Sequence, residues 1–243
     1  KDTSIQFSAK CFKGVYNNYS SAVYRLVNDL DLVLYIGNSL VNEYQDAFVK
    51  IAVEVLTLYE KVVPCIKLMI DREFDSTVDP GTLFRTNNFC SRMMTHFGRT
   101  SCRQVLRTML RNVINELNTV NMQYEIDPTR DKTLTDETIE QNLYILQAYT
   151  TKFIRAFEVN ATNFPEPIIE VCKYLYDKAK SKFSGIKALP YTTVGGFIFL
   201  RLICPCLTTP ESAGIDPDQP ITTECRRDLI LITKIIQNIA NNV

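Results

Sequence analysis

Apolar residues recur at intervals of three and four along most of the chain, the spacing that places one apolar stripe along an α-helix. The segment 20–36 shows it clearly, with Val23, Leu26, Val27, Leu30, Val33 and Leu34 in that rhythm. The same spacing predicts further helices over 43–59, from Pro64 to about Phe74, over 88–97 and over 101–117. The turn signal Asp79-Pro80-Gly81 opens a short loop, Thr82–Asn87, before the helix expected at 88.

The second half of the chain continues the helical pattern after a break at Asp127-Pro128. Helices are expected from Asp136 to about Phe157, after Pro167, over 193–204 and from about Thr223. The segment 193–204 is apolar on nearly every side, which indicates a helix at the centre of a bundle, and Pro205 is expected to end it. No run alternates apolar and polar residues for long enough to predict a strand. The expected fold class is all-α, a helical bundle.

Composition narrows the class of protein further. The 243 residues are 46% hydrophobic and 22% charged, the balance of a soluble globular chain with one large domain or two smaller ones. The 27 basic and 27 acidic residues cancel, so the chain lacks the basic excess of a typical nucleic-acid binder. The longest strictly apolar stretch, Val194–Leu200, is too short to span a membrane. The chain starts at Lys1 and its apolar rhythm runs to Val243, so we expect a piece of a longer protein, truncated at its C-terminal end.

Several kinds of chemistry are not predicted. The eight cysteines are scattered through an apolar-rich chain and are expected to be reduced thiols, and Cys204 and Cys206 lack the further ligands that a zinc site needs. There is no Gly-rich phosphate loop, so the chain is not expected to bind a nucleotide itself. His96 is the sole histidine and has no partner motif. Asp71 and Glu73 are interpreted as part of a solvated helix face.

Three sets of arginines leave alternatives open. Arg99, Arg103, Arg107 and Arg111 recur every four residues, and a solvated face is favoured over a surface that meets an acidic partner or anionic lipid. Arg85 lies at the tip of the loop Thr82–Asn87, in which Leu83 and Phe84 can anchor the loop inward. Arg201 interrupts the apolar segment and must find hydrogen-bond acceptors if it is buried. From the residues alone, a surface position for Arg85 and a salt-bridged core position for Arg201 are favoured.

The segments around these two arginines resemble the paired signatures of Ras GTPase-activating proteins (RasGAPs). The first is Thr82-Leu83-Phe84-Arg85-Thr86-Asn87, and the second is Phe199-Leu200-Arg201-Leu202-Ile203-Cys204-Pro205-Cys206 followed by Pro210. Similar residues precede them over Leu68–Glu73 and follow them over Lys234–Asn241. The sequence departs from the usual family pattern at Thr86, where many members have glycine, and at Cys206, where alanine is usual.

The resemblance implies a domain organisation, a mechanism and a set of site residues. Residues 1–50 would form flanking helices, and residues 51–243 would form the central catalytic domain of the RasGAP type. Arg85 would be an arginine finger and Arg201 the residue that supports its loop. The implied binding residues are Leu83, Phe84, Thr86, Asn87, Leu200, Pro205 and Lys234.

The implied function is acceleration of GTP hydrolysis by a Ras-family small GTPase in its GTP-bound state. The chain would be an activator that is not itself an enzyme and holds no cofactor or metal, because GTP and magnesium belong to the partner. Cytoplasmic localisation is expected, with recruitment to the inner face of the plasma membrane through the parent protein and no nucleic-acid partner. The alternative is a scaffold module that binds a GTPase without activating it.

Overall fold

The computed structural model describes residues 20–84, 86–120 and 122–241. Helices dominate these residues and no strand occurs among them, which confirms the predicted all-α class. The chain divides into two compact units, residues 1–96 and 97–243. The predicted division into flanking helices over residues 1–50 and a central catalytic domain over residues 51–243 is a different boundary, and it stays a prediction.

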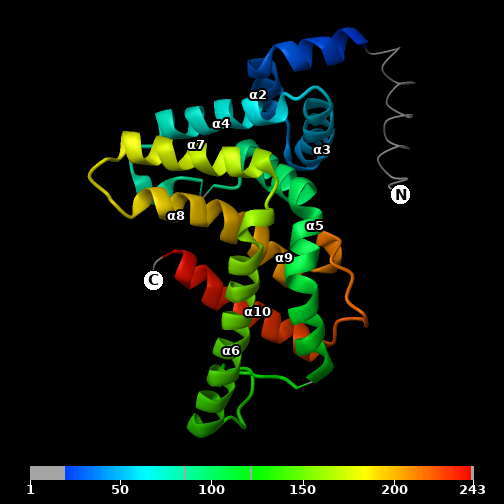
Figure 1. Ribbon diagram of the computed structural model, residues 1–243, viewed down its shortest axis with the longest axis vertical. Coiled ribbons are helices and arrows are strands. Elements are labelled where there is room, and N and C mark those ends of the chain that lie inside the picture. Colours follow the sequence, from blue (N-terminus) through cyan, green and yellow to red (C-terminus); the bar gives the residue numbers. More distant parts are fainter. Residues whose placement is uncertain (1–19, 85, 121, 242–243) are drawn as a thin grey trace. The chain divides into compact units, whose positions relative to one another are not determined.

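The first unit contains a helix over 20–28, α2 (Leu30–Ser39), α3 (Asn42–Leu58), α4 (Val62–Ser76), the short η1 (Pro80–Thr82) and the first turns of α5 (Phe89–Val120) (Figure 1). The prediction of one helix over 20–36 is wrong, because the chain breaks at Asp29. There the carboxylate accepts the Leu32 N–H at 3.1 Å and caps the start of α2. Capping residues of this kind satisfy backbone donors that a helix start leaves open.

Apolar faces of α2, α3 and α4 pack against one another in this first unit. The buried residues of α4 are Val62, Val63, Cys65, Ile66, Met69, Ile70 and Phe74. Their three-and-four spacing is the pattern from which the helix was predicted. Phe74 is the last residue of this apolar stripe, and it directly follows Glu73. The polar Glu73 side chain therefore lies on α4 beside the last buried ring of the helix.

The second unit contains the remainder of α5 and eight further helical elements within the described residues. They are α6 (Asp136–Asn160), η2 (Ala161–Asn163), α7 (Glu166–Lys182), α8 (Leu189–Gly195), η3 (Gly196–Ile203), α9 (Cys204–Thr208), η4 (Glu211–Ala213) and α10 (Thr223–Ala240). Helix α10 crosses α6 and also packs against η3 and α9, while α7 packs against α8 (Figure 1). The core of this unit therefore forms around α10 and the helix that precedes it.

Helix α5 is continuous, although separate helices were predicted over 88–97 and 101–117. Gly98 lies inside it and remains helical. A Cβ atom at Gly98 would lie only 2.2 Å from Cδ2 of the fully buried Leu202. The glycine therefore permits close packing between α5 and η3 instead of ending a helix.

The segments α8, η3 and α9 form one helical run, Leu189–Thr208, whose middle part is a π-helix. The prediction that Pro205 ends this helix is wrong, since the run continues to Thr208. The proline follows directly after the π-helical turns, where the Cys204 N–H bonds to the Phe199 carbonyl five residues back. Proline conflicts with a regular α-helix because it lacks an N–H and crowds the carbonyl at i−4. In the π-helical segment the backbone hydrogen bonds run to the residue five positions back instead of four. The turn before Pro205 therefore does not follow the regular α-helical pattern with which proline conflicts.

This run is also the one helix among the described residues that is long and apolar enough to cross a membrane. Its mean hydropathy is 1.4, and 44% of the most apolar part is buried inside the protein. The buried side chains include Phe197, Leu202 and Ile203. A helix in the core of a soluble domain has the same length and composition, so this property alone does not indicate a span.

Candidate functional site

The loop between α4 and α5, residues 79–88, begins with a well-defined turn. The Asp79 carboxylate accepts the Gly81 N–H at 2.9 Å, and the Asp79 carbonyl accepts the Thr82 N–H at 3.0 Å and the Thr82 hydroxyl at 2.7 Å. Pro80 supplies the fixed φ that suits the first position of η1. Arg85, predicted to be the central residue of the site, lies outside the described residues.

The residues directly before position 85 are held inward. Leu83 and Phe84 are half-buried, and the Phe84 ring contacts the Phe74 ring edge-on with centroids 5.9 Å apart. Phe84 has a φ of 53°, in the left-handed region that costs a non-glycine residue about 1–2 kcal/mol. Its N–H donates to Oε1 of Glu73 at 3.0 Å. The ring contact and this hydrogen bond offset the cost of the backbone conformation.

The residues after position 85 lead into α5 through Asn88. Thr86 and Asn87 are exposed, whereas Asn88 is half-buried. Asn88 Nδ2 donates to Oε2 of Glu73 at 3.3 Å and to the Thr86 hydroxyl at 3.0 Å. Asn88 Oδ1 accepts the Ser91 N–H at 2.9 Å, which is the bond of a helix N-cap. The Asn88 side-chain amide therefore forms hydrogen bonds both to the end of the loop and to the first turn of α5.

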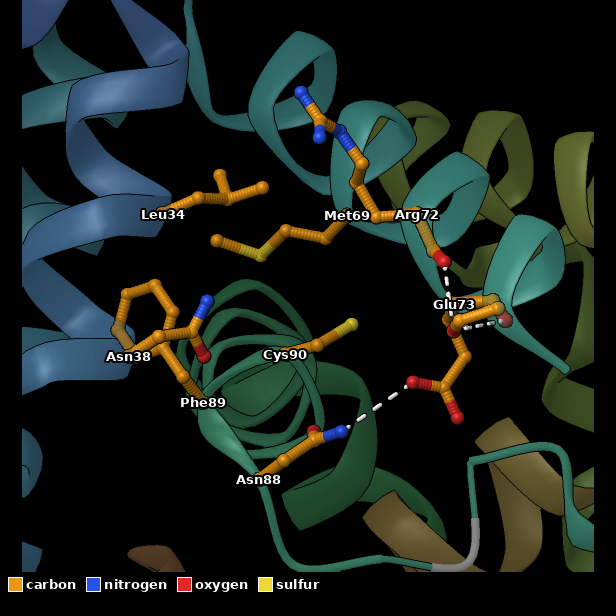
Figure 2. Close-up of a pocket in the computed structure, with 9 residues that line it drawn as sticks. Leu34, Asn38, Met69, Arg72, Glu73, Asn88, Phe89 and Cys90 are labelled. Carbon is orange, nitrogen blue, oxygen red and sulfur yellow. Dashed lines mark hydrogen bonds between the residues drawn. The ribbon is translucent and has the colours of Figure 1, made fainter.

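Glu73 and Asn88 were not among the predicted site residues. The interpretation of Glu73 as part of a solvated face is wrong, since both of its carboxylate oxygens accept hydrogen bonds from the loop (Figure 2 shows the bond to Asn88). Asn88 could have been recognised from sequence as a cap at the start of a helix. The Glu73 contact had no such signal, because it joins residues 11 positions apart on different elements.

The second signature segment lies on η3 and α9. Arg201 is half-buried between the fully buried Leu202 and its preceding neighbour Leu200, which is half-buried as well. Phe199 packs on Phe157 of α6 with ring centroids 5.0 Å apart. Pro205 is half-buried in the first turn of α9. The predicted role of Arg201 as a support for the loop stays a prediction.

Lys234 is exposed on α10, and α10 packs against η3 and α9. The fold of the second unit thus brings the helix that carries Lys234 against the helix that carries Leu200, Arg201 and Pro205. The other predicted site residues, Leu83, Phe84, Thr86 and Asn87, are together in the loop of the first unit. These two groups belong to different units.

Comparisons with known proteins assign the family. The chain matches the RasGAP family, described as GTPase-activator protein for Ras-like GTPase, over residues 65–133 and 129–241. The chain belongs to the RasGAP family. It is 32% identical over 191 residues to the probable Ras GTPase-activating-like protein ngap of Dictyostelium discoideum, a match that covers 77% of this chain and 21% of that protein.

Two further relatives agree with this assignment. A GTPase-activating protein of Drosophila melanogaster is 30% identical over 191 residues, which is 79% of this chain and 16% of the relative. Ras GTPase-activating protein 3 of Mus musculus is 28% identical over 189 residues, which is 78% of this chain and 22% of the relative. The chain therefore spans about a fifth of the length of these curated relatives.

In this RasGAP domain the arginine stripe on α5 meets acidic residues of the same chain. Arg111 donates through Nη2 to Asp218 at 2.5 Å and through Nε to the Asp216 carbonyl at 2.8 Å, and Arg107 lies 3.9 Å from the Asp216 carboxylate. Asn115 also exchanges hydrogen bonds with Asp218. The favoured prediction of a solvated face is therefore wrong for Arg111, which fastens the loop 209–222 to α5.

A buried ion pair joins α10 to the segment that precedes α6. Arg227 donates to both carboxylate oxygens of Glu125 at 2.8 and 2.7 Å, and the two side chains are only 12% and 4% exposed. The hydrogen bond from Arg227 is the main reason that the pKa of Glu125 falls from 4.5 to about 2. The neighbouring Asp228 is fully buried, and burial raises its pKa from 3.8 to about 6. Its Oδ1 accepts the Tyr124 N–H at 2.9 Å.

Seven of the eight cysteines lie in the described part of the RasGAP domain, and all seven are thiols, as predicted. Cys11 lies outside it. Burial raises the pKa of Cys65, Cys172 and Cys204 to about 12, so these thiols stay protonated at neutral pH. Such thiols are poor nucleophiles and poor metal ligands, because both roles require the thiolate.

Proposed function

We propose that this chain accelerates GTP hydrolysis by a Ras-type small GTPase and that Arg85 acts in trans as an arginine finger. The observation that carries the proposal is the family match over residues 65–133 and 129–241, within which an arginine occupies position 85 of the signature loop. The partner would be the GTP-bound GTPase, which supplies the nucleotide, the magnesium ion and the attacking water. The chain would contribute one cation.

The chemistry of arginine suits this role. A guanidinium is planar and charged at every physiological pH, so it can neutralise negative charge that develops on the transferring phosphoryl group. Ras with its activator is the reference case for this effect, and a finger in that pair raises the rate roughly 10³- to 10⁵-fold. That factor applies to the reference pair. We use it as the expected order of magnitude for the loss of stimulated rate in the experiment below.

Further residues are proposed for the same site by resemblance. Arg201 would support the finger loop, and Leu200, Pro205 and Lys234 would contribute to the surface that receives the GTPase. Lys234 is exposed, which is consistent with a contact residue. Leu83 and Phe84 would anchor the loop, while the exposed Thr86 and Asn87 would face the partner. We also propose a cytoplasmic location, with recruitment to the plasma membrane through other parts of the parent protein.

The test is single-turnover GTP hydrolysis by a panel of Ras-family GTPases with the chain in excess. We expect the Arg85→Ala variant to lose roughly 10³-fold or more of the stimulated rate while it still binds the GTPase loaded with a non-hydrolysable GTP analogue. Arg85→Lys should recover little, since an ammonium lacks the planar fork of donors. Arg130→Ala is the matched control, because Arg130 is an exposed arginine in another loop.

Two outcomes would contradict the proposal. Stimulation that survives in Arg85→Ala would exclude Arg85 as the finger. The second outcome is tight binding of the unmodified chain to a GTP-loaded GTPase with no increase in GTP hydrolysis by any member of the panel. That outcome would support the alternative, a scaffold module that binds a GTPase without activating it.

A further inference from the structure

Glu73 lies near the C-terminal end of α4 and reaches the loop 79–88 on both sides of position 85. Its Oε1 accepts the Phe84 N–H at 3.0 Å, one residue before that position. Its Oε2 accepts Nδ2 of Asn88 at 3.3 Å, three residues after it. One carboxylate thus accepts hydrogen bonds from both ends of the five-residue span 84–88.

The bond to Asn88 extends this connection into α5. Asn88 also donates to the Thr86 hydroxyl and caps the helix through the Ser91 N–H, and its carbonyl accepts the Ser91 hydroxyl at 2.9 Å. The Glu73 carboxylate therefore ties the loop to two helices at once. A shift of this carboxylate would be passed to the residues before and after position 85 together.

Open space lies behind this carboxylate. A cavity of about 130 Å³ is lined by Glu73 and Asn88 together with Leu34, Met69, Phe89 and Cys90 (Figure 2). If the side chain at 73 were shortened, water could enter from the cavity and compete for the donors of Phe84 and Asn88. The hydrogen bonds of Glu73 border this cavity, and they act on the loop together with the contact between the Phe84 and Phe74 rings.

We infer that Glu73 is a positioning residue of the activating site, which holds Phe84 and Asn88 on the two sides of position 85. The inference rests on the proposed function of Arg85. Hydrogen bonds donated to a charged carboxylate are stronger than those between neutral groups, so the two bonds of Glu73 can contribute substantially to the position of Phe84 and Asn88. Positioning of a reacting group within about 1 Å can change a rate by roughly 10²-fold.

The decisive variant is Glu73→Gln, which keeps the shape of the side chain but replaces one acceptor oxygen with a donor. Against Asn88 or Phe84 that new donor meets another donor, so one of the two bonds is lost. We expect the maximal single-turnover rate to fall roughly 10- to 100-fold, with the concentration of chain that gives half the maximal rate changed by less than about threefold. Asp75→Asn removes a charge from an exposed neighbour on α4 and should leave both values unchanged.

A second variant tests the geometry directly. Asn88→Asp supplies an acceptor in place of the amide donor, so in Glu73→Gln/Asn88→Asp the donor and the acceptor are exchanged between the two positions. An aspartate at 88 can still cap α5. We expect the double variant to recover most of the rate lost in Glu73→Gln, and Asn88→Asp alone to be impaired because two carboxylates would face each other. A double variant no faster than Glu73→Gln would overturn the inference.

A readout independent of hydrolysis keeps the inference separate from the proposed function. Exchange of the Phe84 amide hydrogen, followed by NMR on the full chain, should become roughly tenfold faster in Glu73→Ala than in the unmodified chain or in Asp75→Ala. Unchanged exchange would overturn the inference whatever the GTPase assay gives. If Arg85→Ala abolishes stimulation while Glu73→Gln keeps the full rate, the positioning role fails and the finger stands. If Arg85→Ala keeps stimulation, the finger fails.

Discussion

The two units of the molecule use polar side chains in different ways. In the first unit, Arg72 and Asp31 of α2 form an ion pair whose side chains are 63% and 65% exposed, and the pair of Arg92 with Asp46 is 17% and 61% exposed. In the second unit, the bidentate pair of Arg227 with Glu125 is buried. In the loop 79–88 the Glu73 carboxylate accepts hydrogen bonds from both sides of position 85, whereas the loop 209–222 is held by several side chains of α5, including Arg111, Asn115 and Asn118.

The difference separates function from stability. A polar contact in the first unit can be lost with little effect on unfolding, because exposed pairs contribute little, yet it can displace the residue that carries the proposed activity. A buried pair in the second unit cannot be broken without leaving a charge in the core. We therefore expect variants of Glu73 in the first unit to change hydrolysis more than melting, and variants of the buried pair Arg227–Glu125 in the second unit to change melting first.

The largest expected effect on stability is that of Arg227→Ala. Removal of the guanidinium leaves the Glu125 carboxylate buried without its main partner, and loss of one member of a buried pair typically costs about 3–5 kcal/mol. Urea unfolding of the variant and the unmodified chain measures the difference. Replacement of both residues, as in Glu125→Gln/Arg227→Met, should cost less than Arg227→Ala alone, and an equal or larger cost would argue against the buried-charge explanation.

An intermediate effect is expected from Asp228, and it depends on pH. The pKa of Asp228 is raised in the folded state, from 3.8 to about 6, so the folded protein binds the proton more tightly than the unfolded chain. The stability that this proton confers is complete below about 3.8 and is lost as the pH rises through about 6. Relative to Asp228→Asn, the unmodified chain should gain about 1 kcal/mol between pH 7 and pH 5.

The range from pH 7 to pH 5 lies above the pH at which Glu125 titrates, and Glu125 has the opposite effect on stability. The pKa of Glu125 is lowered from 4.5 to about 2, so its stabilising contribution is present above about 4.5 and disappears only as the pH falls towards 2. Unfolding of both proteins at pH 7, 6 and 5 therefore isolates Asp228. A constant difference between the two proteins over this range would show that the carboxylate does not titrate there.

The smallest effect is expected from Arg72→Ala in the first unit. Its ion pair with Asp31 is short, at 2.7 Å, but both side chains are mostly exposed, and pairs of this kind contribute about 0–1 kcal/mol. The difference in melting between variant and unmodified chain should shrink further in high salt. A loss above about 2 kcal/mol would contradict the contrast drawn between the two units.

Local sequence patterns predicted the helices well and their interruptions poorly. The three-and-four spacing located α3, α4, α6, α7 and α10 because each buries one continuous face. Separate helices were predicted over 88–97 and 101–117, but α5 is continuous and its Gly98 packs closely on Leu202. Pro205 was predicted to end a helix, but the helical run continues past it to Thr208. In both cases the helix continues for a reason that the neighbouring residues in the sequence do not show: a contact with another helix for Gly98, and a π-helical segment before Pro205.

The site divides in the same way. The signature loop and the helix with Arg201 were predicted from resemblance, as was the RasGAP family that the comparisons confirm. Glu73 was missed because its hydrogen bonds reach across 11 and 15 positions, and the pairing of Arg111 with Asp218 spans 107. Charge patterns along one helix identify which face is polar but contain no information about the element that meets it.

The π-helical segment Gly196–Ile203 affects how this region can tolerate insertions and deletions. A π-helical turn accommodates more residues than an α-helical turn, so such a segment stores extra residues without lengthening the helix in proportion. A single deletion within it can be absorbed by a return to the α-helical register, which would keep the side chains that follow on their original faces, whereas the same deletion in a regular α-helix would turn them by about 100°. In this domain those side chains include Leu202, packed in the core beside Gly98. A deletion of one residue early in this segment is therefore expected to leave the core position of Leu202 intact, where the same deletion in a regular α-helix would not.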